Sequence, residues 1–165
     1  MFDAFLQIEN VQGESTDSSH SNWIEVVDFN VGCEQPASGS SRSTAGGATS
    51  GRVSCYPLRF RHLIDKASPK LYIACCQGAH IKKITMEVCR ATGDKQVYYK
   101  VDLEDTVVSR IDTVGEGKSD ESVPFEDVYL SYGKITWTYT ATDHTTGKPA
   151  GNVTGSWSVV ENKGQ

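Results

Sequence analysis

The sequence predicts a mainly β protein, a two-sheet antiparallel β-barrel or sandwich with one short flanking α-helix at about residues 68–78. Three observations support this fold class. Short segments of alternating apolar and polar residues recur along the chain, turn-forming residues separate them, and a single segment carries matching helix start and stop signals. The 165 residues fit one domain, 1–165, which contains a long Gly/Ser-rich extended loop at 34–52.

Three strands are expected in the N-terminal part of the chain. The first has apolar residues at alternate positions, namely Phe2, Ala4, Leu6 and Ile8. The second runs from Trp23 to about Gly32 with apolar residues on both faces, so part of each face should be covered. The third covers 53–64, and one of its faces carries Leu58, Phe60 and His62. We interpret the basic residues that alternate along it as a solvated strand face: Arg59, Arg61 and His62.

The segment 34–52 differs from the rest because Gly, Ser, Ala and Thr dominate it. Such a segment has almost nothing to bury, and ordering it costs conformational entropy. Connections longer than about 12–15 residues inside a domain are usually functional or disordered. A linker between domains is excluded, since the piece before it is too short to fold alone. We therefore expect a long loop that becomes ordered against a partner.

The helix is the element with the strongest local signals. Ser68 is a suitable N-cap, because its hydroxyl can accept a hydrogen bond from an otherwise unpaired backbone N–H. Pro69 fits the first helical position, and Gly78 fits the left-handed position that ends a helix. Beyond it, alternation predicts six more strands, at 81–89, 97–104, 106–114, 123–132, 135–141 and 153–159.

Composition excludes several classes of function. The net charge is −5, and no basic stripe of the kind that displaces counterions from a duplex is present, so nucleic acid is not an expected partner. The N-terminus lacks the pattern of a secretory signal, and no run approaches the roughly 20 apolar residues of a membrane span. We expect a chain made in the cytoplasm without membrane insertion. Its five cysteines, with no CxxC spacing, are interpreted as small buried side chains, not as disulfides or a metal site.

Catalytic motifs are also missing from the sequence. None of the four histidines has a carboxylate or cysteine at a recognisable motif spacing, apart from His144 beside Asp143 in a turn. The acidic run Asp102, Glu104 and Asp105 is interpreted as solvated strand surface. No phosphate-binding loop or nucleophile elbow occurs. We therefore expect no catalytic, cofactor or metal site, and an enzyme is the class that we favour least.

A stand-alone binding module remains as the alternative. It would use an exposed aromatic platform on a small β-barrel to bind a ligand or a protein, with Trp23, Trp137 or Trp157 as candidates. Core or subunit-interface packing is the reading of these tryptophans that we favour.

Several segments, taken together and in order, resemble the Hcp (haemolysin-coregulated protein) family, the tube subunit of bacterial type VI secretion. The opening motif is Val11-Gln12-Gly13-Glu14-Ser15-Thr16-Asp17, then His20 and Trp23-Ile24-Glu25-Val26. The strand-to-helix junction is Pro57-Leu58-Arg59-Phe60, then Ile64-Asp65-Lys66-Ala67-Ser68-Pro69-Lys70-Leu71 and Gly78. A later segment, 128–135, resembles the family's penultimate hairpin. The 34–52 loop and the tail after Thr140 depart from the pattern.

This resemblance implies a structural protein without cofactors. Six copies would form a homohexameric ring, and rings would stack into a hollow tube like a phage tail tube. A surrounding contractile sheath would propel the tube, with a spike protein at its tip and effector proteins in its lumen. The chain would thus be secreted from the cytoplasm through the machine without a signal peptide.

Two sets of residues are assigned to this assembly. We expect the loop at 38–50 to reach a neighbouring subunit or ring, with contacts from Ser40, Ser41, Arg42, Ser43, Thr44, Gly46 and Gly47. The family's inner sheet includes the strand at 23–32, where Asp28 and Asn30 share a face. We expect these two side chains on the lumen wall.

Overall fold

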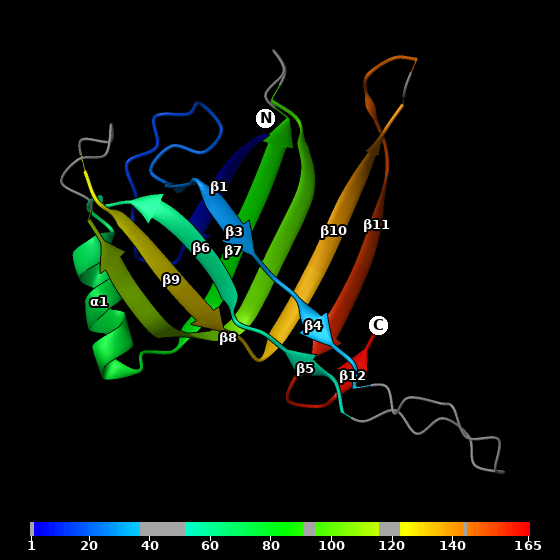
Figure 1. Ribbon diagram of the computed structural model, residues 1–165. Helices are drawn as coiled ribbons and strands as arrows, with labels where there is room; N and C mark the ends of the chain where they lie inside the picture. Colours follow the sequence, from blue (N-terminus) through cyan, green and yellow to red (C-terminus); the bar gives the residue numbers. More distant parts are fainter. Residues whose placement is uncertain (1, 37–51, 91–94, 116–122, 144) are drawn as a thin grey trace, which may run out of the picture.

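Two antiparallel β-sheets that share one strand and one apolar core make up the fold (Figure 1). The computed structural model describes residues 2–36, 52–90, 95–115, 123–143 and 145–165. The first sheet has the order β12-β11-β10-β8-β7-β1-β2, formed by Lys163–Gly164, Pro149–Ser158, Lys134–Thr142, Val97–Val114, Ile81–Arg90, Phe2–Ile8 and Ile24–Val26. The second contains β3 (Asp28–Asn30), β6 (Leu58–Leu63), β9 (Phe125–Ser131) and the end of β8. The predicted β class with one short helix is confirmed.

Strand β8 belongs to both sheets, where the sequence predicted two separate strands at 97–104 and 106–114. Its first part pairs with β7 and β10, and its second part pairs with β9. The bend lies at Asp105, whose φ of 50° is left-handed, and the backbone N–H of Gly133 donates to the carbonyls of Glu104 and Asp105 there. Strands β9 and β10 therefore pair with different parts of β8. The predicted hairpin at 128–135 is instead a crossing between sheets.

The strand predicted at 23–32 is also divided. It breaks at Val27 into β2, which pairs with β1, and β3, which pairs with β6. The backbone N–H of Val27 donates to the carbonyl of Arg61 at this corner. Both faces of the segment are apolar because it passes from one sheet to the other. The segment thus joins the edge of the first sheet to the edge of the second, and the two sheets form a sandwich.

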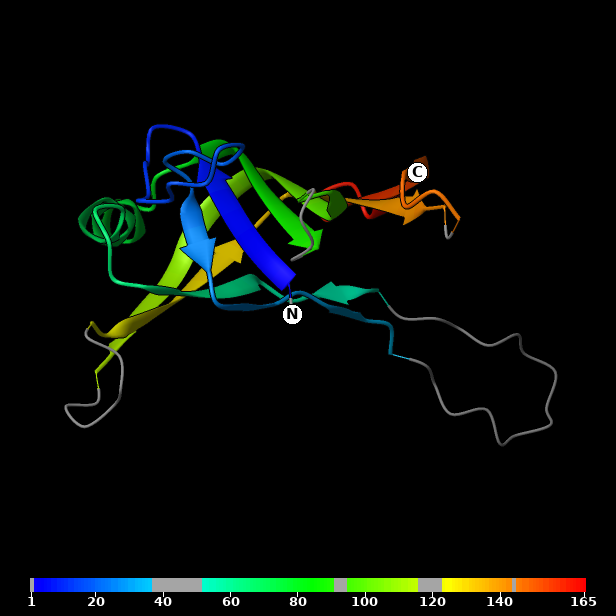
Figure 2. The same ribbon diagram turned by 90° about the horizontal axis from the view of Figure 1, so that it is seen from above.

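A short two-stranded arm projects beyond the sandwich. It consists of β4 (Cys33–Glu34) and β5 (Ser54–Cys55), which pair antiparallel. Tyr56 and Pro57 separate β5 from β6, so the strand predicted at 53–64 is divided here as well. Seen from above, the arm continues from the second sheet and lies beneath the β10–β11 hairpin (Figure 2). The arm therefore carries the two ends of the 34–52 loop.

The core lies between the sheets and is formed by the alternate side chains that the sequence pattern indicated. Fully buried members come from most of the strands, namely Leu6, Ile24, Leu58, Phe60, Ile84, Met86, Leu103, Leu130 and Ile135. Burying a leucine or phenylalanine side chain stabilises a fold by about 1.5–3 kcal/mol. This shared core fixes the two sheets face to face.

Helix α1 (Ser68–Gln77) lies at the end of the sandwich away from β11 (Figure 1). It ends as predicted, at Gly78 in the left-handed conformation. Its predicted N-cap is wrong, because Ser68 is already helical and Ala67 occupies the cap position. The Asp65 carboxylate accepts from the N–H of Ala67, while the Ser68 hydroxyl accepts from the N–H of Asp65. No helix in the described part of the chain has the length and apolar character to cross a bilayer.

Candidate functional site

The outward face of the second sheet carries the two residues predicted for the lumen wall. Asp28 and Asn30 lie on β3 opposite Arg61 and Arg59 of β6, and Asp127 of β9 is the next neighbour of Arg61. Because side chains alternate along a strand, these five residues share one side of the sheet. We call them the polar face.

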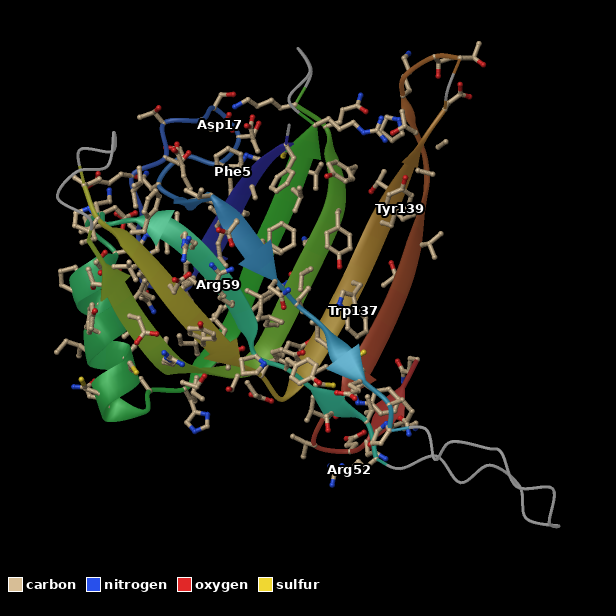
Figure 3. All side chains as sticks on the ribbon, viewed as in Figure 1. Phe5, Asp17, Arg52, Arg59, Trp137 and Tyr139 are labelled. Carbon is tan, nitrogen blue, oxygen red and sulfur yellow. The ribbon has the colours of Figure 1, made fainter. Side chains whose placement is uncertain are left out.

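An ion-pair network joins the polar face across three strands. The Asp127 carboxylate accepts from the Arg61 guanidinium at 2.7 and 3.1 Å and from Arg59 at 2.9 Å, while Arg59 also pairs with Asp28. Hydrogen bonding from Arg61, helped by Arg59, lowers the pKa of Asp127 despite its burial. Arg59 is labelled in Figure 3 among the side chains of this sheet. The two arginines are thus ion-paired, partly buried side chains.

His62 lies on the opposite, buried side of the same strand, with only 1% of its surface exposed. The interpretation of Arg59, Arg61 and His62 as a solvated face is therefore wrong. The His62 Nε2 lies 3.2 Å from the Glu126 carboxylate, which is also buried and accepts from Thr113. The Asp65 carboxylate lies 3.8 Å from the other ring nitrogen. Sequence spacing missed this cluster because its members come from different strands and a loop.

His20 is clamped between two carboxylates in the opening loop. Its ring nitrogens lie 2.9 Å from Asp17 and 3.0 Å from Glu87, and the ring stacks on Phe5 at 4.3 Å between centroids. Figure 3 shows Asp17 and Phe5 together at this corner. Hydrogen bonds from Lys95 first and His20 second hold the pKa of Asp17 well below its usual range. The sequence contains no motif spacing around His20, and the structure shows that its two carboxylate partners are brought to it by the fold.

Gly13, another residue of the opening motif, lies where a side chain would not fit. A Cβ on Gly13 would lie 2.4 Å from the Trp23 carbonyl oxygen and 2.6 Å from the Ile24 Cα. This close approach lets the loop pair with its own return: Gly13 donates to the Asn22 carbonyl and Ser15 to that of Trp23. The motif therefore builds a folded loop that presents Asp17 and His20 to β7, and its described residues serve the fold.

The predicted loop contacts at Ser40, Ser41, Arg42, Ser43, Thr44, Gly46 and Gly47 lie outside the described residues. The arm at the base of that loop is described. The Tyr132 hydroxyl donates to the carbonyl of Tyr56, the Tyr56 hydroxyl donates to the Glu34 carboxylate, and Arg52 donates to the carbonyl of Val159. The bonds from Tyr132 and Arg52 attach the arm to the sandwich, and the bond between Tyr56 and Glu34 joins its two strands.

A cavity of about 540 Å³ lies between the arm and the β10–β11 hairpin. Its lining is mostly apolar and includes Cys33, Val53, Cys55, Trp137 and Trp157. Both tryptophans are partly buried and pack against the core, which is the packing favoured for them, and both also line this cavity. Trp23 makes an edge contact with His20. The buried indole N–H of Trp157 has no hydrogen-bond acceptor among the described residues.

The β10–β11 hairpin continues beyond the arm, and two apolar side chains on its inward face are exposed there. Tyr139 and Val153 are direct cross-strand partners on this face, and they are 46% and 70% exposed. Figure 3 labels Tyr139 on this part of β10, further along the strand than Trp137. A second exposed apolar group lies near the corner between the sheets, where Phe2 meets Phe29 edge-on and where Val27, the corner residue, is also exposed. We call these two groups the hairpin patch and the corner patch.

The acidic run on β8 takes part in cross-strand ion pairs on the outward face of the first sheet. Asp102 pairs with Lys83 at 3.3 Å and accepts from the Thr85 hydroxyl, and Glu104 pairs with Lys134. Among the described residues no three His, Cys, Asp or Glu side chains are grouped as metal ligands.

Comparisons with known proteins agree with the fold described above. A model of the family "Type VI secretion system effector, Hcp" matches residues 5–139. Protein hcp1 of Pseudomonas aeruginosa is 32% identical over 161 residues, which cover 97% of this chain and 96% of that protein. The Major exported protein of the same organism is 28% identical over 79% of this chain and 77% of its own length. A solved structure of a type six secretion system protein superposes with a TM-score of 0.90 at 32% identity, covering 100% of both chains.

Proposed function

The chain belongs to the Hcp family of type VI secretion system proteins, and from this premise we propose that its copies form hexameric rings that stack into the hollow inner tube of that system. The full-length superposition on a type six secretion system protein carries this proposal, since one match covers 100% of both chains. Effector proteins in the lumen, a spike protein at the tip and a surrounding contractile sheath are the proposed partners. Export is supported by the similarity to a protein named as the Major exported protein.

Ring closure needs a contact between two different surfaces of neighbouring copies. We assign these to the hairpin patch and the corner patch. The hairpin patch is the inward, apolar side of a sheet that no described residue covers at Tyr139 and Val153, and the corner patch presents exposed Phe2 and Val27. Large apolar side chains exposed together are typical of interaction sites. Their pairing around a ring would bury both.

Light scattering coupled to size-exclusion chromatography tests the ring. We expect the mass of six subunits for the natural chain and of one subunit for Val153→Asp, because a charge would be buried without a partner in the contact. Ile73→Asp is the matched control, since Ile73 is 56% exposed on α1 and belongs to neither patch. A hexamer that persists in Val153→Asp would refute the assigned contact, and a monomeric natural chain would refute the ring.

A monomer that a small ligand stabilises in thermal melting would instead support the alternative of a stand-alone binding module. The packing of Trp137 and Trp157 against the core weakens that alternative, because it leaves less of either ring exposed as a platform.

The loop at 38–50 is proposed to contact a neighbouring subunit or ring. Its two ends are carried by the β4–β5 arm, which projects from the sandwich (Figure 1). Hydrogen–deuterium exchange on the stacked rings and on monomeric Val153→Asp gives the test. Slower exchange at 38–50 in the assembly is expected, whereas equally fast exchange in both samples would contradict the contact.

The polar face is proposed as lumen wall. Its ion pairs already neutralise Asp28 in part, while the exposed Asn30 keeps an amide available to cargo. Rings of Asp28→Ala and Asn30→Ala should retain less effector in pull-down assays than rings of the natural chain. Thr138→Ala, on the outward face of the first sheet, is the control. Unchanged retention in both test variants would remove these residues from the wall.

A further inference from the structure

Two of the five cysteines lie directly opposite each other on the arm. Cys33 of β4 and Cys55 of β5 are register partners. The backbone N–H of Tyr56 donates to the carbonyl of Gly32 at 2.9 Å, so the adjacent pair, 32 with 56, is hydrogen-bonded. Pairs alternate along an antiparallel ladder, which makes Cys33 and Cys55 a non-hydrogen-bonded pair. In such pairs the Cα atoms are about 4.5 Å apart and the side chains are closest.

The two side chains also point to the same side of the arm. Both line the apolar cavity beneath Trp137 and Trp157. Disulfides form between Cα atoms about 4.4–6.8 Å apart, and the spacing of a non-hydrogen-bonded pair falls within this range. The remaining cysteines are elsewhere: Cys75 and Cys76 lie on α1, and Cys89 is buried in β7.

We propose that Cys33 and Cys55 are a modification site, at which an intrachain disulfide forms when the chain meets an oxidising small-molecule disulfide. The exposed Cys33 attacks first, because burial, with the nearby Cys33 as a smaller contribution, raises the pKa of Cys55 and suppresses its thiolate. The Cys33 thiolate attacks one sulfur of the oxidant and releases one small thiolate. The Cys55 thiolate then attacks the mixed disulfide at Cys33 and releases the second. Two protein thiols are oxidised, and one small disulfide is reduced to two thiols.

The bridge would close the arm below the whole predicted contact loop. A reducing cytoplasm keeps both thiols free, so only the strand pairing of the arm holds the loop ends together while rings assemble. The bridge then belongs to the exported form, and this timing alone rests on the proposed function. A closed arm restricts the loop of roughly 20 residues in the unfolded chain and stabilises the exported protein.

Peptide mapping of the purified full-length chain tests the bridge. The chain is incubated with glutathione disulfide, alkylated, and digested with trypsin without reduction. The sequence places Cys33 in the tryptic peptide 1–42 and Cys55 in the peptide 53–59. The expected result is one species in which these two peptides are linked, with a mass equal to the sum of the two unmodified peptides minus two hydrogens. Separate glutathione adducts on the two cysteines, or a dimer band in non-reducing electrophoresis that maps to them, would overturn the proposal.

Thermal melting provides an independent measurement. Oxidation should raise the Tm of the natural chain by roughly 6–12 °C, as a loop of this length predicts. Cys33→Ser should lose this rise, and Cys76→Ser, which alters an exposed cysteine on α1, should keep it. An equal rise in Cys33→Ser would assign the effect to another group and refute the site. The mass of the assembly, measured by light scattering, tests the ring independently. A hexamer that forms no disulfide would therefore refute the bridge alone.

Discussion

Replacing His20 by alanine should destabilise the chain strongly, although His20 lies in a loop. The substitution removes hydrogen bonds to Asp17 and Glu87, each worth about 1.5–3 kcal/mol when a charged group takes part. It also removes the ring stacked on Phe5, worth about 0.5–1.5 kcal/mol. Both carboxylates keep a lysine, since Lys95 pairs with Asp17 and Lys100 lies 3.7 Å from Glu87. The expected loss of unfolding free energy is therefore about 3–5 kcal/mol, below the sum of the separate contributions.

Urea unfolding at neutral pH measures this loss, with the protomer concentration held fixed because assembly adds to apparent stability. The neighbouring exposed Ser19 supplies the control: Ser19→Ala keeps the backbone bond to Asp17 and should change stability by less than about 0.5 kcal/mol. A cycle with Glu87→Ala should show a coupling of about 1–3 kcal/mol with His20. A loss below about 1 kcal/mol for His20→Ala, with additive effects in the cycle, would refute the clamp.

Three further predictions concern the opening loop, the second sheet and the core. Gly13→Ala should cost roughly 2–4 kcal/mol in urea unfolding, because its Cβ would overlap the Trp23 carbonyl; an unchanged midpoint would show that the loop shifts freely. The low pKa of Asp127 in the folded state contributes stability that is present above the usual carboxyl value, about 4, and is lost as pH falls through the folded value. The urea concentration at the unfolding midpoint should therefore decrease when the pH is lowered below about 4. Asp127→Asn, which keeps the shape of the side chain beside Arg61, should make this decrease smaller. Parallel pH dependences of the two proteins would contradict the prediction. Phe60→Ala should cost about 3–5 kcal/mol by circular dichroism melting, since Phe60 is fully buried between the sheets, and a loss below about 1 kcal/mol would contradict this burial.

The sequence predicts the strands and the helix end well, because these depend on local pattern. Alternation identifies Phe60 as inward-facing, and Gly78 ends the helix in the conformation that glycine favours. The corner at Val27 escapes prediction, and the break expected at Asp105 is a bend within one strand, since alternation does not reveal which sheet a strand joins. Ser68 fails as the N-cap because Asp65 caps the turn before the helix.

The candidate site is predictable only in part, for a similar reason. A period of two places Asp28 and Asn30 on one face, as the β3–β6 register confirms. The ion pairs of Asp28 depend on which strand lies beside β3, and the clamp of His20 joins residues 67 positions apart. Neither set of contacts can be predicted from the spacing of residues in the sequence.

The passage of β8 through both sheets has a mechanical consequence. Strands in one sheet resist separation through their hydrogen bonds, whereas two stacked sheets are normally held only by side-chain packing. In this chain a pull on either sheet reaches the other along the covalent backbone at Asp105, where Gly133 adds two hydrogen bonds from the β9–β10 connection. The two sheets therefore cannot slide apart without straightening that bend, and under an applied force they should move together.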